Sequence, residues 1–377
     1  MAEILDYFQS RNEEMLALLR RLVEMESPTT EKAAMDRFGA FLSNELRNVG
    51  AAISAIGIRD YGDHLLAQWG EGKGQILVLM HMDTVYPLGE LDRRPFRLED
   101  DLAYGPGIYD MKGGVAITLF ALRGLRELGL STKKQVTILC NSDEEVGSPT
   151  SRELIEVEAM KSDYVLVMEP AASPEGALKT SRKGVGRFDL IVTGRAAHAG
   201  VNHELGRSAI EELAHQILRL HSLTDYEAGI TLNVGLVEGG TRSNVVADWA
   251  RAEVDLRVAT LKQGERMVQQ ILSLQPVTPD VTLKIVGGLN RPPMERTPEI
   301  VALFQRAKRL GTELGLELSE GSSGGGSDGN FTAALGVPTL DGLGAIGDGA
   351  HSPEEHILVK RLPERAALLA KLLQELD

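Results

Sequence analysis

Three short apolar stretches of the sequence each lead into histidine or carboxylate side chains, which are residue types that can bind metal ions. The stretch ILVLM runs into His81 and Asp83. The stretch VTILC leads through a short polar segment to Glu144 and Glu145, and YVLVM ends directly at Glu169. Singly, these residues fit a core histidine, a solvated turn or an exposed strand end. Their recurrence after successive strands indicates one shared rim, because ligands of open α/β sheets bind beyond the carboxyl ends of the strands.

Two further residues complete a set that two metal ions can share. Asp110 lies in GPGIYDMKGG before an expected helix, and His351 lies in GAHSPEEH. In isolation they would be a helix-capping aspartate and a loop histidine. With Asp110 bridging, one ion has His81, Asp110 and Glu169, and the other has Asp110, Glu145 and His351. Three protein ligands per ion leave a place for water, and nitrogen and carboxylate ligands suit zinc while tolerating cobalt or manganese.

Asp83 and Glu144 are then available for supporting roles. His81 and Asp83 lie on the same side of an extended strand, so the carboxylate can accept the second imidazole N–H and orient the ring. Consecutive side chains diverge, so Glu145 can bind metal while Glu144 acts on a water as general base. A rival is a serine hydrolase using Ser323, since GSSGG fits G-x-S-x-G. That motif needs a strand before the serine and a helix starting at it, and neither is apparent.

Composition narrows the class of protein. The 377 residues carry a formal net charge of −14, which argues against nucleic acid or an anionic membrane surface as a partner. The single cysteine, Cys140, excludes an internal disulfide framework, fits a reducing compartment and is expected to be buried. No apolar run is long enough to span a membrane, and the N-terminal pattern is that of an amphipathic helix and not of a signal peptide. We therefore expect a cytoplasmic protein.

The elements that must position these residues follow two different patterns. The apolar stretches are unbroken, which is typical of strands covered on both faces, and helical patterns at 113–130 and 154–160 alternate with them. This alternation predicts an α/β domain with a mixed, largely parallel sheet, formed by residues 1–179 and 293–377. Between 180 and 292 the order changes to βαββαβ, which predicts an inserted ferredoxin-like α+β domain.

Taken together, the motifs resemble the dinuclear zinc exopeptidases and deacylases, which include aminoacylase, acetylornithine deacetylase, succinyl-diaminopimelate desuccinylase and bacterial glutamate carboxypeptidase. The matching segments follow the family's order along almost the whole chain: HMDTV, GPGIYDMKGG, DEEVGS, MEP, GRAAHAG, GGTRSNVV, DLR, GGGSD and GAHSPEEH. The resemblance implies the zinc-exopeptidase fold, two zinc ions held as described above, and Glu144 as the base. It is strongest to the glutamate carboxypeptidase branch, which implies hydrolysis of an amide next to a free carboxylate.

The resemblance also gives the inserted domain roles as a lid and in dimerisation. His198 would reach the active site of a partner subunit and polarise the scissile carbonyl, which implies a homodimer. Asn244 and Arg257 would hold the terminal carboxylate of the substrate, since arginine binds carboxylates as a bidentate fork. Backbone N–H groups of the GGGSD loop would bind the same anion, with contributions from Gly324, Gly325, Gly326 and Ser327.

The expected substrate is a small N-acyl amino acid or dipeptide. Phe331 follows GGGSD where the family has small residues, so it could line or narrow the specificity pocket. Alternative reactions are deacylation of another N-acyl amino acid, of the acetylornithine or succinyl-diaminopimelate type, and dipeptide hydrolysis. A catalytically silent binding protein on the same scaffold is the alternative from another class. Glu144 beside all five ligands argues against it, because a binding protein needs no base.

Overall fold

The computed structural model describes residues 2–172 and 175–377 and divides into two compact units. The first unit comprises Met1–Ser181, Arg296–Ser323 and Ser327–Asp377. The second comprises Arg182–Glu295 together with Gly324–Gly326. The predicted boundaries at 179 and 292 lie within a few residues of these limits, but three glycines from the C-terminal segment join the second unit. The lid and dimerisation roles of the inserted domain stay a prediction.

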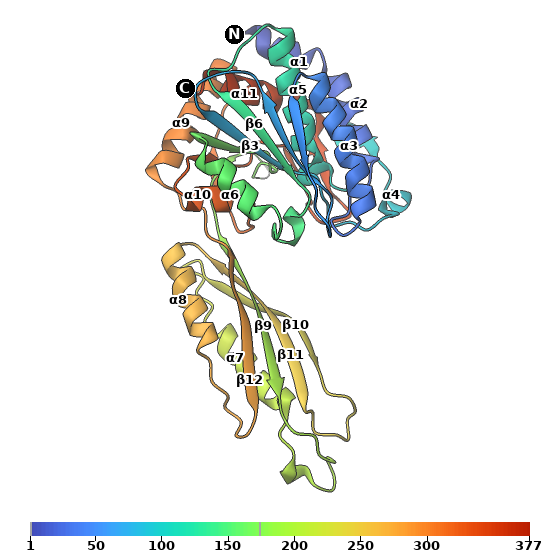
Figure 1. Cartoon of the computed structure of the whole chain (residues 1–377), viewed down its shortest axis with the longest axis vertical. Coiled ribbons are helices and arrows are strands. Elements are labelled where there is room, and N and C mark those ends of the chain that lie inside the picture. The colour runs from blue at the N-terminus through green and yellow to red at the C-terminus, as the bar shows by residue number, and fades with distance from the viewer. Residues whose placement is uncertain (1, 173–174) are drawn as a thin grey trace. The chain divides into compact units, whose positions relative to one another are not determined.

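A six-stranded sheet of order β1-β2-β6-β3-β7-β14 forms the centre of the first unit (Figure 1). Its strands are β1 (Ala52–Ile56), β2 (His64–Trp69), β3 (Gln75–His81), β6 (Gln135–Asn141), β7 (Tyr164–Val167) and β14 (Thr339–Leu340). Strand β3 is parallel to β6 and β7, and β14 is parallel to β7. Strand β2 is antiparallel to both of its neighbours, β1 and β6, so it is the one reversed strand among these six. The predicted mixed, largely parallel sheet is confirmed.

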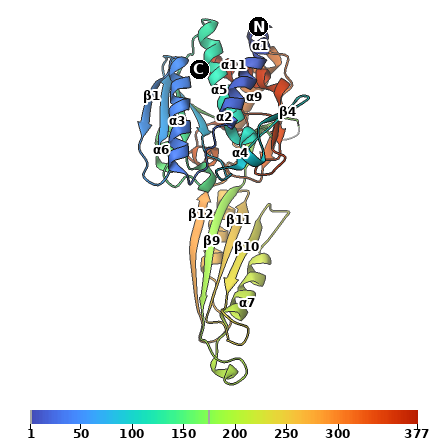
Figure 2. The ribbon, with the colours of Figure 1, turned by 90° about the vertical axis from the view of Figure 1, so that its right-hand side faces the viewer.

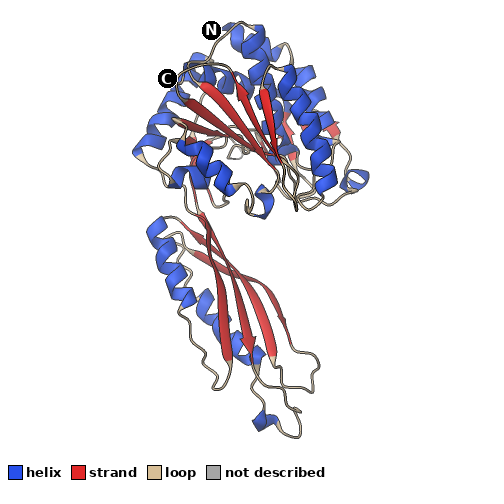
Figure 3. Ribbon diagram, viewed as in Figure 1, coloured by secondary structure: helices blue, strands red, loops and turns tan. Residues whose placement is uncertain are grey.

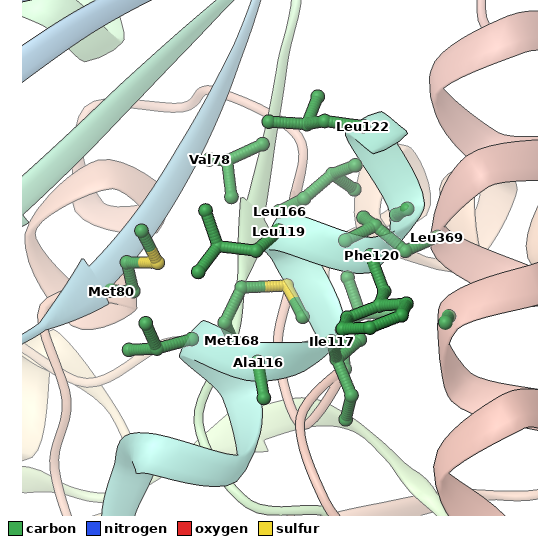
Figure 4. Packing of buried hydrophobic residues seen from close by; sticks show 14 of the residues in the cluster. Val78, Met80, Ala116, Ile117, Leu119, Phe120, Leu122, Leu166, Met168 and Leu369 are labelled. Atoms are coloured by element: carbon green, nitrogen blue, oxygen red, sulfur yellow. The ribbon is translucent and has the colours of Figure 1, made fainter. Parts of the chain in front are cut away.

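The two faces of this sheet are covered by different helices. The helices of the first unit are α1 (Ala2–Gln9), α2 (Asn12–Val23), α3 (Lys32–Asn48), α4 (Glu90–Arg93), α5 (Gly113–Glu127), α6 (Arg152–Met160), α9 (Pro298–Glu313), α10 (Gly329–Ala334) and α11 (Leu362–Glu375). Val78 and Met80 of β3 pack toward α5 and α11 (Figure 4). The alternate residues Leu77 and Leu79 enter a second core with α6 and α10. Burial of both faces explains the unbroken apolar runs of the sequence.

Short strands, which the sequence pattern does not predict, pair with one another within the loops around the main sheet. Strands β4 (Arg97–Glu99), β5 (Leu102–Tyr104), β15 (Gly347–Asp348) and β16 (His356–Leu358) form a sheet of order β15-β16-β5-β4. Strand β8 (Leu178–Arg182) pairs with β13 (Glu320–Ser323). The antiparallel pairing of β16 with β5 places the chain around residue 350 next to the chain around residue 108.

The second unit is a four-stranded antiparallel sheet with two helices (Figures 2 and 3). Its elements are β9 (Gly184–Thr193), α7 (Ala209–His221), β10 (Thr231–Gly239), β11 (Trp249–Val258), α8 (Leu261–Leu272) and β12 (Thr282–Arg291). The spatial order β10-β11-β9-β12 is that of a ferredoxin-like fold, as predicted. Both helices contribute to one apolar cluster, so they cover the same face of the sheet. Within the described residues of both units, none of the helices has the length and apolar character required to cross a membrane.

Candidate metal centre

The parallel central strands deliver the candidate ligands to one edge of the main sheet. His81 is the last residue of β3 and pairs with Asn141, the last residue of β6. Glu144 and Glu145 follow β6 in a single 3-10 turn (η2, Glu144–Val146). Glu169 comes two residues after the end of β7, which is the neighbour of β3 on its other side. The shared direction of the three strands therefore brings the three segments together.

Two groups of three side chains meet at this edge, with their ligand atoms within 4.8 Å of one another in each group. In the first group, His81 Nε2 lies 3.1 Å from Asp110 Oδ1 and 3.6 Å from Glu169 Oε1. In the second, His351 Nε2 lies 3.3 Å from Asp110 Oδ2 and 3.2 Å from Glu145 Oε2. Each oxygen of Asp110 faces a different histidine, which is the arrangement expected of a bridging carboxylate.

The residues present fit a pair of divalent cations. Each group offers an imidazole nitrogen and two carboxylates, without thiolate, which is a donor set that suits zinc. Glu145 Oε1 is buried and has no hydrogen-bond partner among the residues that the structure describes. A buried carboxylate oxygen without a donor is unfavourable unless a cation or a water binds it. The orphaned oxygen therefore points to a ligand at the second group.

The ionisation of the cluster reflects its crowded carboxylates. The carboxylates of Asp110 and Glu145, which accept hydrogen bonds from the protonated ring, raise the pKa of His351 from 6.5 to about 11. Burial alone would lower the pKa of His81, but hydrogen bonds with Asp110 and Asp83 outweigh it and raise that pKa well above 6.5. Burial would likewise raise the pKa of Asp110, but the two histidines hold it well below its usual range. Without metal, protons on the two histidines neutralise part of the negative charge of the surrounding carboxylates, which bound metal ions would otherwise neutralise.

Asp83 supports the site in more ways than predicted. Its own backbone carbonyl lies 3.0 Å from His81 Nδ1, closer than its carboxylate Oδ1 at 3.4 Å. The carboxylate accepts the N–H groups of Glu144 at 3.3 Å and of Glu145 at 3.1 Å. It also accepts the hydroxyl of Thr29 at 2.8 Å. Thr29 was not predicted from the sequence, because it lies 54 residues away from Asp83 and belongs to no recognised motif.

The turn at residues 144–146 is held at both ends by buried carboxylates. Asp143 accepts four hydrogen bonds of between 2.6 and 3.2 Å from the backbone and hydroxyl groups of residues 150–151. Asp328 accepts the hydroxyl of Ser148 at 2.5 Å. The two aspartates lie inside the motifs DEEVGS and GGGSD, but the sequence pattern alone predicted no role for either of them. Their burial and their donors show that they shape the turn that carries the predicted base.

In the second unit, the structure brings His198 and Asn244 together. His198 forms an isolated antiparallel bridge with Val245, the residue that follows Asn244. His198 lies beyond the end of β9 and Asn244 lies before the start of β11, at the end of the sheet where Thr193 pairs with Trp249. The two residues therefore form a single candidate site at that end of the sheet.

Arg257 lies near the opposite end of the same sheet. Its guanidinium donates to Asp255 at 2.8 and 2.9 Å and to the carbonyl of Gly324 at 3.5 Å. From Trp249 to Arg257 the strand β11 advances by eight residues, each of which adds about 3.4 Å, so the two ends are about 27 Å apart. The structure therefore does not bring Arg257 and Asn244 to one carboxylate within a single chain.

The loop Gly324–Gly326 is attached to the second unit by arginine. Arg182 Nη1 donates to the carbonyls of its last two glycines at 3.2 and 3.3 Å. Ser327, by contrast, is fully buried, its N–H donates to Asn330 Oδ1 at 2.9 Å, and its hydroxyl donates to Asp341 Oδ2 at 2.6 Å. In the loop predicted to bind an anion, the three glycines are therefore at least partly exposed, whereas the N–H and hydroxyl of Ser327 are buried and already hydrogen-bonded within the protein.

Two expectations about side chains near this loop change. Phe331 is 1% exposed and lies in the core with α6, and the guanidinium carbon of Arg152 lies 4.8 Å from its ring centroid. The prediction that it lines a specificity pocket is therefore wrong, because α10 turns this side chain inward. Ser323 ends β13, and helix α10 begins only at Gly329. The strand–serine–helix elbow of a serine hydrolase is not formed.

Comparisons with known proteins identify the family of this chain. Residues 77–375 match the model of Peptidase family M20/M25/M40. The chain is 33% identical to carboxypeptidase G2 from Pseudomonas sp. (strain RS-16), over 98% of this chain and 91% of that protein. It is 27% identical to the succinyl-diaminopimelate desuccinylase of Dechloromonas aromatica, over 96% and 98%. The crystal structure of aminopeptidase PepT from Bacillus cereus superposes with a TM-score of 0.78 at 23% identity, covering 97% and 98%.

These matches define the class of protein. The fold is that of metal-dependent peptidases and deacylases that act on small molecules, and the chain has two groups of side chains that could hold metal ions. The chain belongs to Peptidase family M20/M25/M40.

Proposed function

We propose that this protein is a zinc-dependent exopeptidase or deacylase that cleaves the amide bond of an N-acyl amino acid or short peptide with a free terminal carboxylate. The observation that carries the proposal is the shared aspartate, whose two oxygens face His81 and His351 at 3.1 and 3.3 Å. The similarity to carboxypeptidase G2 supports a substrate with a free terminal carboxylate, and the resemblance of the motifs to the glutamate carboxypeptidase branch favours an N-acyl glutamate. The second candidate is a deacylase of the desuccinylase type, which the similarity to that enzyme supports.

In this proposal, His81 and Glu169 hold one zinc ion, Glu145 and His351 hold the other, and Asp110 contacts both. When bound, such ions polarise the scissile carbonyl and make a water more acidic. Glu144 takes the proton of the attacking water and later delivers it to the leaving amine, as general base and then general acid. Asp83 holds the backbone of Glu144 and orients the ring of His81, so it positions both groups.

The second unit would supply substrate recognition. Arg257 and the Gly324–Gly326 loop would bind the terminal carboxylate, since a guanidinium fork and backbone N–H groups both suit that anion. His198 and Asn244 lie beyond the end of the sheet at Trp249, which is about 27 Å along β11 from Arg257, so they would serve the site of a second copy of the chain. We therefore propose a homodimer formed through the second unit, in which His198 polarises the carbonyl in the partner's site.

The first test is amine release from a panel of N-acyl glutamates, N-acetylornithine, N-succinyl-diaminopimelate, aromatic acyl derivatives and dipeptides. Metal-free and zinc-reconstituted protein are compared side by side. We expect zinc-dependent release concentrated on one amine, which identifies the side-chain preference. Release that persists in the metal-free protein, or no release from any compound with two metals bound, would count against the proposal.

The base is tested with Glu144→Gln, and Glu153→Gln, an exposed glutamate on α6, is the matched control. We expect Glu144→Gln to bind both metals but to lose turnover by about 10²- to 10⁴-fold, the usual contribution of general acid–base catalysis. Glu153→Gln should keep the wild-type rate. Near-normal turnover in Glu144→Gln would show that another group removes the proton.

The dimer is tested by mixing two inactive variants, His198→Ala and Glu144→Gln. A mixed dimer contains one site with an intact base and an intact histidine from the other chain. Random pairing makes about half of the dimers mixed, and one of the two sites in each mixed dimer is intact. We therefore expect about one quarter of wild-type activity. If no activity returns after the chains exchange, His198 does not act across the interface.

A further inference from the structure

One buried carboxylate outside the two ligand groups accepts four hydrogen bonds. Glu355 is 1% exposed. Its Oε1 accepts the N–H groups of Tyr109 at 2.9 Å and of Asp110 at 3.0 Å. Its Oε2 accepts the N–H of Gly107 at 3.0 Å and the hydroxyl of Tyr86 at 2.6 Å. Both oxygens are therefore engaged by the loop that carries the bridging aspartate.

Glu355 also belongs to the loop that carries the other histidine. It lies four residues after His351, a non-glycine residue at φ +60°. Such a backbone conformation is unfavourable for a histidine unless surrounding contacts fix it. The carbonyl of Ser352 accepts Arg94 Nη1 at 2.8 Å and the hydroxyl of Tyr86 at 3.2 Å, so this loop is held at neighbouring positions. One carboxylate thus joins the Asp110 loop to the His351 loop.

We propose that Glu355 is a positioning residue of the metal centre, fixing the backbone of Asp110 against the loop of His351 so that both ligand groups keep their geometry. The inference rests on the proposed function, because it assumes that these groups bind metal. Residues that orient metal ligands from outside the ligand set commonly contribute about 10- to 100-fold in metal affinity. Asp110 is shared by both groups, so its displacement weakens both ions.

A glutamine cannot replace this carboxylate. Four donors converge on two oxygens, and the amide of glutamine would turn an N–H₂ group toward at least one backbone N–H or hydroxyl. The adjacent Glu354 provides the control, because its side chain is 79% exposed and its contact with Arg97 Nη2 is long, at 3.9 Å. Glu355→Gln and Glu354→Gln are therefore the same chemical change at neighbouring positions with opposite burial.

The experiment measures metal binding without turnover. Metal-free wild-type protein, Glu355→Gln and Glu354→Gln are titrated with Zn²⁺ and Co²⁺ in competition with a chelating dye, and the visible spectrum of bound Co²⁺ is recorded. We expect Glu355→Gln to bind both ions about 10- to 100-fold more weakly with a changed Co²⁺ spectrum, and Glu354→Gln to match wild type. A folded Glu355→Gln protein with wild-type affinity and spectrum would overturn the proposal.

Should metal-free Glu355→Gln fail to fold, Tyr86→Phe decides the question, because it removes one of the four donors to Glu355, together with the longer contact of the same hydroxyl to Ser352, and leaves the carboxylate in place. Weaker binding in Tyr86→Phe supports the positioning role, and unchanged binding overturns it. The proposed function fails in a different way, namely if wild-type protein itself binds neither Zn²⁺ nor Co²⁺. The two failures therefore give separate results in the same titration.

Discussion

Replacing Thr29 with valine removes a hydroxyl from the interior of the candidate metal centre, and with it a short hydrogen bond to Asp83 and a longer one, of 3.5 Å, to the carbonyl of Thr84. The hydroxyl of Thr29 donates to Asp83 Oδ2 at 2.8 Å, and the two side chains are 5% and 1% exposed. Because water cannot reach Oδ2 to replace the lost donor, the N–H of Glu145, at 3.1 Å, is the one hydrogen-bond donor left to this oxygen among the described residues. A hydrogen bond to a charged group contributes about 1.5–3 kcal/mol. We therefore expect Thr29→Val to lower the free energy of unfolding by about 2 kcal/mol.

The adjacent Thr30 gives a matched control, since it is exposed and the same substitution there should change stability by less than about 0.5 kcal/mol. Each unit contains one tryptophan: Trp69 in the first and Trp249 in the second. In a Trp249→Phe background, fluorescence therefore reports on the unit that contains Thr29. The measurement is urea unfolding of the metal-free proteins at pH 7 and 25 °C.

If Thr29→Val and Thr30→Val unfold at the same urea concentration, the hydrogen bond to Asp83 contributes nothing and the reasoning is refuted. If Thr29→Val is less stable, turnover should fall as well, because the same carboxylate holds the backbone of Glu144 and Glu145. Residues that support metal ligands indirectly typically alter activity by about 10- to 100-fold.

Two further predictions concern protons and packing. The pKa values of His81 and His351 are both raised, that of His351 to about 11, so both side chains are protonated at pH 7 in the metal-free protein. Each histidine must therefore lose a proton before it can bind a metal ion. Metal loading at pH 7 should therefore release about two protons, with apparent affinity rising as pH rises; calorimetry in buffers of different ionisation enthalpy measures this, and release of none would contradict it. Gly114→Ala, inside α5, should destabilise the protein although alanine is the better helix former by about 1 kcal/mol, because its Cβ would lie 2.1 Å from the carbonyl oxygen of Met168. Gly57→Ala, where a Cβ meets no described atom within 4 Å, is the control, and thermal unfolding that ranks the two equally would refute the packing argument.

The sequence predicted those parts of the fold that repeat over many residues. The unbroken apolar runs identified β3, β6 and β7, since alternate residues of each strand enter cores on opposite faces. Parallel strands end at one edge, so the meeting of His81, Glu145 and Glu169 followed from strand direction. The order βαββαβ likewise fixed the topology of the second unit.

Shorter and more distant relations could not be read from the sequence. Strands of two to four residues, such as β15 and β16, are too short to show a period, although they bring His351 next to the Asp110 loop. The N-terminal segment, whose amphipathic pattern predicted one helix, forms two helices, α1 and α2. Hydrophobic spacing alone does not reveal the break between them. The roles of Thr29 and Glu355 depend on contacts between distant segments and on burial, neither of which the residue type encodes.

The attachment of the second unit has a consequence for engineering. Its first and last strands are neighbours, and the N–H groups of Arg182 and Met294 each donate to the carbonyl of the other at 3.0 Å. Strand neighbours of this kind have Cα atoms about 5.5 Å apart, so a short linker could close the chain after excision of the insertion. The Gly324–Gly326 loop fits against Val185 and Arg291, however, where a Cβ on its last glycine would lie within 3 Å of both. A cassette exchanged between relatives must therefore carry two separate segments of sequence, and a graft of residues 182–295 alone would leave the loop facing a surface it does not match.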